Sequence, residues 1–130
     1  MTELSFTDAE MRQLEMTMLP IENAHTLPGW AYTSSAFYDA EMHNIFTREW
    51  IGVCRQEDIG QPGDYFCAEL VGEPIVILRN KRGEVAAFLR TCRHRGACVV
   101  EGRGNARFFR CPFHGWAYNL DGALISARGM

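Results

Sequence analysis

The first part of the chain carries a helical pattern of apolar positions. Between residues 8 and 19, apolar side chains recur at the spacing of one helix face: Met11, Leu14, Met18 and Leu19. Thr7 and Glu10 have the spacing of a capping box, and Pro20 ends the pattern. This predicts a short helix over residues 8–19. A serine at position 34 or 35 can cap a second helix that runs to residue 46.

From residue 50 onward the pattern changes to short runs rich in aromatic and β-branched residues. Turn signals at 61–64, 80–83 and 119–122 separate these runs. The pattern predicts strands over 50–54, 65–70, 74–79, 85–91, 107–111 and 116–120. We therefore expect a mainly β fold, a small antiparallel sheet structure preceded by two short helices, with a division into residues 1–49 (the helical leader) and 50–130.

The composition describes an ordinary globular chain. Of its 130 residues, 47% are hydrophobic and 22% are charged, which excludes disorder and a collagen helix. No apolar run approaches the roughly 18–20 residues that cross a bilayer, so we expect no membrane segment and no signal peptide. Five cysteines, an odd number, favour a reducing compartment, and we expect the cytoplasm.

Charge is distributed unevenly along the chain. Residues 1–78 hold three basic and thirteen acidic residues, whereas residues 79–110 hold nine basic and two acidic ones. A basic segment raises the question of nucleic acid, but no nucleic-acid motif accompanies it. Docking of a redox partner, or pairing with the acidic leader of a neighbouring subunit, accounts for the same charge, so we expect no nucleic-acid partner.

Two Cys/His pairs are the candidate chemistry. Cys92 and His94 form the first pair, and Cys111 and His114 form the second. Pairs on two loops that leave neighbouring strands can converge on one point, and two thiolates with two imidazoles are the ligand set of a Rieske centre. The same residue types also form structural zinc sites, although a Cys-x-His first pair is unusual there.

The residues around these pairs resemble the Rieske motif of ring-hydroxylating oxygenase large (alpha) subunits. The motif is Cys92-x-His94-Arg95-Gly96 with Cys111-Pro112-Phe113-His114-Gly115-Trp116. The resemblance extends to Trp50 and to the segments 62–65, 104–108, 116–118 and 121–122, and covers most of residues 30–128.

This resemblance implies a Rieske-type antiparallel β-sandwich with a small subdomain that binds a [2Fe-2S] cluster. Cys92 and Cys111 would hold the buried iron, and His94 and His114 the outer iron. A ferredoxin or flavin reductase would supply electrons, and a mononuclear Fe(II) in a C-terminal domain absent from this chain would receive them. The family implies a homotrimer or another oligomer. A stand-alone Rieske ferredoxin is the alternative.

The sequence departs from the high-potential respiratory Rieske proteins. Ala97 and Phe113 stand where those proteins have a disulfide, and Trp116 stands where they have a serine that hydrogen-bonds to a cluster sulfur. Fewer donors stabilise the reduced state less. We therefore expect a potential near the low end of the range of roughly −150 to +300 mV.

The remaining cysteines and histidines carry no predicted function. Cys98 is expected to be a buried, inert thiol, and Cys54 and Cys67 are expected in the core. His25 and His43 are expected in solvent rather than in a mononuclear iron site.

Overall fold

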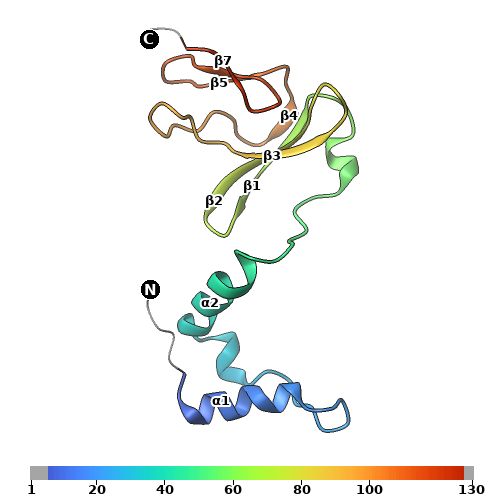
Figure 1. Ribbon diagram of the computed structural model, residues 1–130, viewed down its shortest axis with the longest axis vertical. Helices are drawn as coiled ribbons and strands as arrows, with labels where there is room; N and C mark the ends of the chain where they lie inside the picture. Colours follow the sequence, from blue (N-terminus) through green and yellow to red (C-terminus); the bar gives the residue numbers. More distant parts are fainter. Residues whose placement is uncertain (1–5, 128–130) are drawn as a thin grey trace. The chain divides into compact units, whose positions relative to one another are not determined.

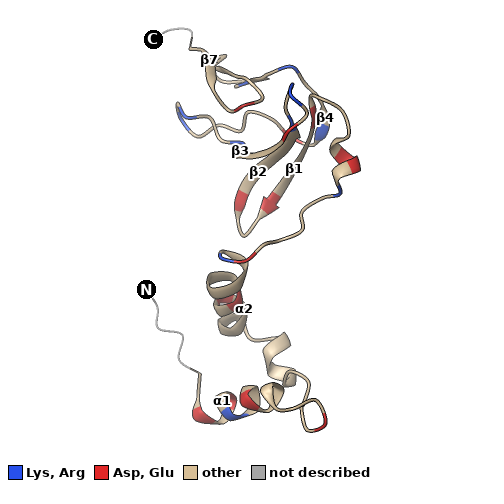
Figure 2. Cartoon of the chain, turned by 45° about the vertical axis from the view of Figure 1, so that its right-hand side comes forward, with Lys and Arg blue, Asp and Glu red and all other residues tan. Residues whose placement is uncertain are grey.

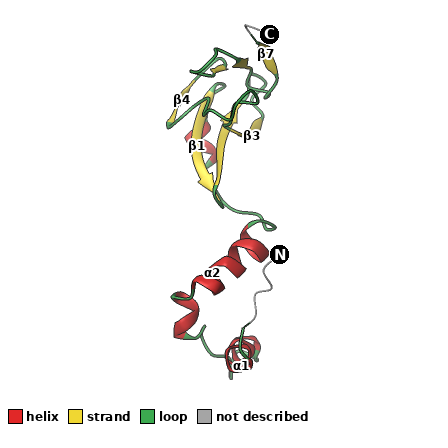
Figure 3. Cartoon of the chain, turned by 90° about the vertical axis from the view of Figure 1, so that its left-hand side faces the viewer, coloured by secondary structure: helices red, strands yellow, loops and turns green. Residues whose placement is uncertain are grey.

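The computed structural model describes residues 6–127, and the chain divides into two compact units, Met1–Ile51 and Gly52–Met130 (Figure 1). In Figure 3 the helices lie in the first unit and the strands in the second, apart from one helical turn beside β1. No helix of the described part has the length and apolar character needed to cross a membrane.

The first unit contains the two predicted helices in shortened form. Helix α1 spans Asp8–Glu15 and is followed by the 3-10 turn η1 (Met16–Met18). A second 3-10 turn, η2 (Gly29–Tyr32), precedes α2 (Ser35–Glu41), and α2 continues into the π-helical turn η3 (Met42–Phe46). The capping box is confirmed, because the Glu10 N–H donates to Thr7 Oγ1 and the Thr7 N–H donates to Glu10 Oε2. Ser34 caps α2 in the same way through the Phe37 N–H.

A small aromatic cluster holds the helices of this unit together. The rings of Phe6, Trp30 and Phe37 lie with centroids 5.5–6.0 Å apart, and the Trp30 indole N–H donates to the Gln13 side chain at 2.6 Å. Ala31 is the buried apolar residue of this unit among those described. The leader therefore buries little surface of its own.

The second unit consists of two antiparallel sheets. The strands β1 (Asp64–Leu70), β2 (Glu73–Arg79), β3 (Val85–Leu89) and β4 (Arg103–Asn105) form a sheet in the order β3-β2-β1-β4. The strands β5 (Phe109–Arg110), β6 (Ala117–Tyr118) and β7 (Leu124–Ser126) form a smaller sheet in the order β5-β6-β7. This confirms the predicted fold class, a mainly β structure preceded by two short helices.

The main core lies where the two sheets meet. Val76 and Leu78 of β2 pack with Phe109 of β5 and with Leu120, and all four side chains are buried. These two β2 residues are two positions apart, so they lie on the same face of the sheet. A second core cluster contains both candidate cysteines and is described below.

Two polar contacts fix the ends of the four-stranded sheet. Asn105 donates to the Pro62 carbonyl at 3.1 Å and to Asp64 Oδ1 at 2.9 Å. Gly63 lies between these partners with φ +95°, and a Cβ there would come within 2.8 Å of the Ala106 carbonyl oxygen. The segments 62–65 and 104–108 therefore form one structural unit, although they are far apart in the sequence.

A buried amide joins the turn between β2 and β3 to the turn before β7. The Asn80 side chain donates to Glu84 at 2.9 Å and to Asp121 at 3.0 Å, and its oxygen accepts from the N–H groups of Arg82 and Glu84. Arg82 in turn forms ion pairs with Glu84 and Asp121. The small sheet is thereby tied to the large one.

Several predicted elements are corrected. Residues 50–54 form no strand; they have no regular secondary structure and lead into the 3-10 helix η4 (Gln56–Ile59), which contacts β1 and β2. Trp50 is fully exposed, and Cys54 is exposed rather than in the core. The predicted strands at 107–111 and 116–120 shrink to two paired residues each, while β4 and β7 were not predicted.

Candidate metal centre

Cys92 and His94 lie on a loop that two main-chain hydrogen bonds close. The Cys92 N–H donates to the Ala97 carbonyl at 2.7 Å, and the Gly96 N–H donates to the Cys92 carbonyl at 2.9 Å. An antiparallel bridge between Thr91 and Cys98 closes the base of the loop. These backbone hydrogen bonds define the conformation of the loop.

Cys111 and His114 lie on a second loop with the same backbone pattern. The Cys111 N–H donates to the Trp116 carbonyl at 2.8 Å, and the Gly115 N–H donates to the Cys111 carbonyl at 3.0 Å. Gly115 has φ +72°, the same value as Gly96 in the first loop. The two candidate pairs are thus carried by two copies of one turn.

The positive φ explains the two loop glycines. A side chain in the left-handed region costs roughly 1–2 kcal/mol, and glycine avoids this cost. A Cβ on Gly96 or Gly115 would meet no protein atom within 4 Å. Among the atoms described, the requirement for glycine therefore comes from the backbone conformation and not from crowding.

The loops bring all four candidate residues together, with the thiols inside and the imidazoles outside. Cys92 and Cys111 are 3% and 2% exposed and belong to the same core cluster. The rings of His94 and His114 meet edge to face with centroids 4.7 Å apart. His94 is half-buried and His114 is exposed.

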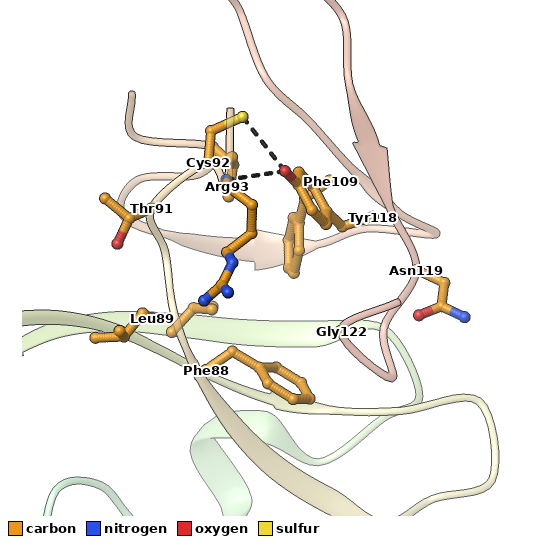
Figure 4. Close-up of a pocket in the computed structure, with 11 residues that line it drawn as sticks. Phe88, Leu89, Thr91, Cys92, Arg93, Phe109, Tyr118, Asn119 and Gly122 are labelled. Atoms are coloured by element: carbon orange, nitrogen blue, oxygen red, sulfur yellow. Dashed lines mark hydrogen bonds between the residues drawn. The ribbon is translucent and has the colours of Figure 1, made fainter. Parts of the chain in front are cut away.

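Tyr118 of β6 connects the second loop to the first. Its hydroxyl oxygen accepts from the Arg93 N–H at 3.0 Å and lies 3.3 Å from Cys92 Sγ (Figure 4). Because the oxygen already accepts from a backbone donor, the hydroxyl hydrogen is free to be donated to the sulfur. Burial, followed by the hydrogen bond with Cys92, raises the pKa of Tyr118 and keeps its hydroxyl a donor.

Hydrogen bonds favour the thiolate form of Cys92. Burial raises the pKa of this thiol, but hydrogen bonds from Tyr118, the backbone of His94, Cys111 and the backbone of Arg95 together outweigh burial and lower it. A thiolate is the form of cysteine that binds a metal. The lowered pKa of Cys92 therefore favours the binding of a cation at the inner half of the site.

The outer half favours neutral imidazole. The His94 ring lies parallel to the indole of Trp116, with an interplanar angle of 13° and centroids 4.7 Å apart. Burial lowers the pKa of His94, and the nearby His114 and Arg95 lower it further. A ligating nitrogen must be unprotonated, so these effects also favour metal binding.

A cavity of about 450 Å³ lies behind the inner half of the site, between the two sheets. In Figure 4 the Arg93 side chain extends into it toward Phe88 and Leu89. The Arg93 side chain therefore points away from the Cys92 sulfur, whereas the Arg95 charge acts on His94.

The donor set fits a centre with two metal ions. Residues 6–127 contain no group of three or more His, Cys, Asp or Glu side chains placed to hold a single ion. They do contain a thiol pair and an imidazole pair side by side. Two thiolates on one iron and two imidazoles on the other are the ligands of a Rieske [2Fe-2S] cluster.

The other candidate residues lie outside this set. Cys98 is half-buried; it accepts a hydrogen bond from Arg90 at 2.8 Å and donates to the Val100 carbonyl at 3.0 Å. Cys67 of β1 is also half-buried. His25 and His43 are exposed, as predicted.

Sequence reasoning missed the contacts of Trp116 and Tyr118, which it assigned only to the motif. The available signal was their spacing. Residues two apart on a strand face the same way, so both side chains can reach the first loop.

Comparison with known proteins agrees with this geometry. The family profile described as "Rieske [2Fe-2S] domain" matches residues 49–130. The chain belongs to this family. The Rieske cofactor inferred from the two Cys/His pairs is thereby confirmed, and the zinc alternative is set aside.

Similar proteins are oxygenase subunits. The Rieske chain is 41% identical over 106 residues to the carnitine monooxygenase oxygenase subunit of Acinetobacter baumannii, covering 81% of this chain and 29% of that protein. It is 37% identical over 113 residues to the benzene 1,2-dioxygenase alpha subunit of Pseudomonas putida, covering 86% of this chain and 25% of that protein. The chain thus spans less than a third of the length of either relative.

Solved structures give the same result. The apo form of a quaternary ammonium Rieske monooxygenase matches with a TM-score of 0.74 and 40% identity, over 80% of this chain and 31% of that chain. Naphthalene 1,2-dioxygenase from Rhodococcus sp. bound to indole matches with a TM-score of 0.80 and 27% identity, over 95% of this chain and 28% of that chain. The resemblance to oxygenase alpha subunits is confirmed, and the matches favour it over a stand-alone ferredoxin.

Proposed function

We propose that this Rieske chain is the electron-transfer part of an oxygenase terminal component. It takes electrons singly from a ferredoxin or flavin reductase and passes them to a mononuclear non-haem iron elsewhere in the enzyme. One observation carries the proposal: twin loops hold a buried thiol pair next to a more exposed imidazole pair. Residues 50–130 form the Rieske domain in this proposal, and residues 1–49 form a separate leader.

The proposed ligands are Cys92 and Cys111 for the inner iron, and His94 and His114 for the outer iron. When bound, the cluster accepts and releases one electron at a time. The lowered pKa of Cys92 favours its thiolate inside the core, and the lowered pKa of His94 favours its neutral imidazole.

Reduction adds one negative charge to the site, and the chain offers donors that stabilise it. The Tyr118 hydroxyl lies 3.3 Å from the Cys92 sulfur. The backbone of His94 and of Arg95 also lowers the pKa of Cys92 and so favours a negative sulfur, and the Arg95 charge acts at the imidazole side. These groups are fixed in place, so little reorganisation accompanies the change of charge.

Electrons enter and leave at the imidazole side in this proposal. His114 is exposed and His94 half-buried, whereas both cysteines are almost completely covered. A docked partner therefore comes closest to the outer iron. His94 and His114 would link that iron to the surface, because they are the more exposed of the four proposed ligands.

The surface charge supports an acidic electron donor. Figure 2 shows that basic side chains predominate in the loops of the second unit, whereas acidic ones predominate in the first. Arg93, Arg95, Arg107 and Arg110 are all exposed. A basic surface around the electron entry side attracts an acidic partner and speeds its association at low salt.

The complete enzyme is proposed to be a mono- or dioxygenase that assembles as a homotrimer or another oligomer. Its relatives include a carnitine monooxygenase and a benzene dioxygenase, so quaternary amines and aromatic hydrocarbons are the two candidate substrate classes. The cytoplasm is the proposed compartment, because all five cysteines are unpaired and a reducing environment preserves them.

Absorption and EPR spectra of the purified protein, before and after dithionite, test the ligand assignment. We expect a red-brown protein whose reduced form has a rhombic signal of low average g. His94→Cys and His114→Cys should each change this signal. His43→Cys is the matched control, because His43 is exposed in the other unit. A colourless zinc protein, or spectra unaffected by the two ligand substitutions, would contradict the proposal.

Metal content of the complete gene product tests the oxygenase assignment. An oxygenase subunit should contain a third, mononuclear iron in addition to the cluster and should consume dioxygen with its substrate. A product with only the two cluster irons would be a stand-alone carrier.

A further inference from the structure

Two aromatic residues at the end of the second ligand loop contact the proposed ligands in the first loop. Trp116 directly precedes β6 (Ala117–Tyr118) and Tyr118 ends it, and both side chains belong to the buried cluster that contains the two cysteines. The Tyr118 hydroxyl reaches Cys92 and the Arg93 N–H, while the Trp116 indole covers the ring of His94. Each residue therefore contacts the loop opposite its own.

The indole of Trp116 is held firmly. Its side chain is 7% exposed, within the same core cluster as the two cysteines. Its carbonyl accepts the hydrogen bond that closes the second loop, so its backbone is fixed as well. A buried ring on a fixed backbone has little freedom to rotate.

The ring of His94 is held in a different way from most metal-binding histidines. Such a histidine usually donates its second ring N–H to a carboxylate or a carbonyl, and this bond fixes the ring plane. Among residues 6–127, no hydrogen bond to the His94 ring is present. The nearly parallel stack on Trp116, with an interplanar angle of 13°, is the contact that defines the plane.

The second histidine lacks this support. The nearest aromatic ring besides His94 belongs to Phe113, which is tilted by 49° with its centroid 5.5 Å away. Phe113 is also largely exposed. The two imidazoles are therefore not equivalent, and His94 is the one with a fixed ring.

We propose that Trp116 is a positioning residue that fixes the ring plane of His94 by stacking and leaves its outer ring nitrogen free for an electron-transfer partner. The inference rests on the assignment of His94 as a cluster ligand. A stack orients the ring without using a nitrogen, whereas a hydrogen bond would occupy one. Trp116 thus provides rigidity at one of the two imidazoles of the proposed site while a ring nitrogen of His94 stays available.

The test compares Trp116→Leu with Trp116→Phe in the cluster-loaded protein whose histidines are labelled with ¹⁵N. ENDOR spectra of the reduced protein resolve the couplings of the two ligating nitrogens. We expect W116L to shift or broaden one coupling and leave the other unchanged, because only His94 loses its stack. W116F retains an aromatic ring and should restore the wild-type pattern. Phe113→Leu, which removes the exposed tilted ring, is the matched control and should change neither coupling.

The outcomes separate the inference from the function on which it rests. A wild-type protein without a mixed-ligand signal refutes the ligand assignment itself. A wild-type signal with both couplings unchanged in W116L refutes only the role of Trp116, as does an equal change in both couplings. If W116L does not fold, Trp116→Met replaces it, since the unbranched, flexible methionine side chain adapts better to the space left by the ring and has no aromatic face. The same readings then apply.

Discussion

The Tyr118→Phe substitution removes one oxygen atom that serves two groups of the first ligand loop. That oxygen accepts from the Arg93 N–H at 3.0 Å and lies 3.3 Å from the Cys92 sulfur. The phenyl ring keeps the packing of a side chain that is 9% exposed. The change therefore isolates the hydroxyl from the rest of the side chain.

The substitution affects two free energies: that of unfolding and that of reduction of the site. An unpaired donor costs about 1–3 kcal/mol, and the lower end applies to the Arg93 N–H because this residue is exposed and water can reach it. A hydrogen bond to a charged sulfur contributes about 1.5–3 kcal/mol. If roughly 1 kcal/mol of this depends on the extra negative charge of the reduced site, the midpoint potential shifts by about 40 mV, since 59 mV corresponds to a tenfold change for one electron.

The sign follows from the charge. The hydroxyl stabilises the more negative, reduced state, so its loss should make the potential more negative. Stability should fall by about 1 kcal/mol, measured by urea unfolding. A spectroelectrochemical titration of wild type and Y118F measures the potential directly.

Tyr65→Phe is the matched control for this experiment. Tyr65 packs edge to face on Phe109 at 5.4 Å, and its hydroxyl has no hydrogen bond in the described part of the chain. This control should leave the potential unchanged. A Y118F potential that equals the wild-type value, or is more positive, would refute the proposed donation to the Cys92 sulfur.

Three further substitutions test the scaffold. Gly115→Ala should cost about 1–2 kcal/mol of unfolding free energy because φ is +72°, whereas Gly29→Ala, which has ordinary φ and open space, should cost less; urea unfolding compares the two. Gly63→Ala should cost more than Gly115→Ala, because its Cβ would approach a backbone oxygen to 2.8 Å in addition to the strained φ; equal losses would contradict this. Asn105→Ala should raise the pKa of Asp64 toward its ordinary value of 3.8, because the Asn105 hydrogen bond is the largest cause that lowers it. A lowered folded-state pKa gives stability that is present above the unfolded value and lost as pH falls through the folded one, so this variant should lose acid stability; NMR titration and acid unfolding check both.

Local signals predicted the helix starts and the central strands, because these depend on neighbouring residues. The Thr7 capping box involves residues three positions apart, and β1 and β2 follow a clear β-strand pattern. The expected strand at 50–54 failed for a different reason. Alternation shows that a segment can pair, but pairing also needs a strand beside it, and this segment instead leads into η4, which packs against β1 and β2.

The short strand β4 was missed for the converse reason. Its residues, Arg103–Asn105, are polar or lack a side chain, so no apolar alternation marks them. They are held in place by pairing with Asp64, Tyr65 and Phe66 of β1. A tertiary partner determines this strand, and a single sequence does not contain that information.

In the two ligand loops, the spacing from cysteine to glycine is what determines the turn, and the spacing from cysteine to histidine is not. Histidine lies two residues after cysteine in the first loop and three after it in the second, so the ligand spacings differ. Glycine lies four residues after cysteine in both, and the same two backbone hydrogen bonds and the same φ of +72° occur in both loops. The repeated unit is therefore Cys-x3-Gly, and the histidines are placed on it at different positions. Since the turns are alike, this offset makes the two imidazoles approach from different directions. They accordingly meet edge to face at 4.7 Å instead of stacking on each other, which leaves the face of His94 open to Trp116.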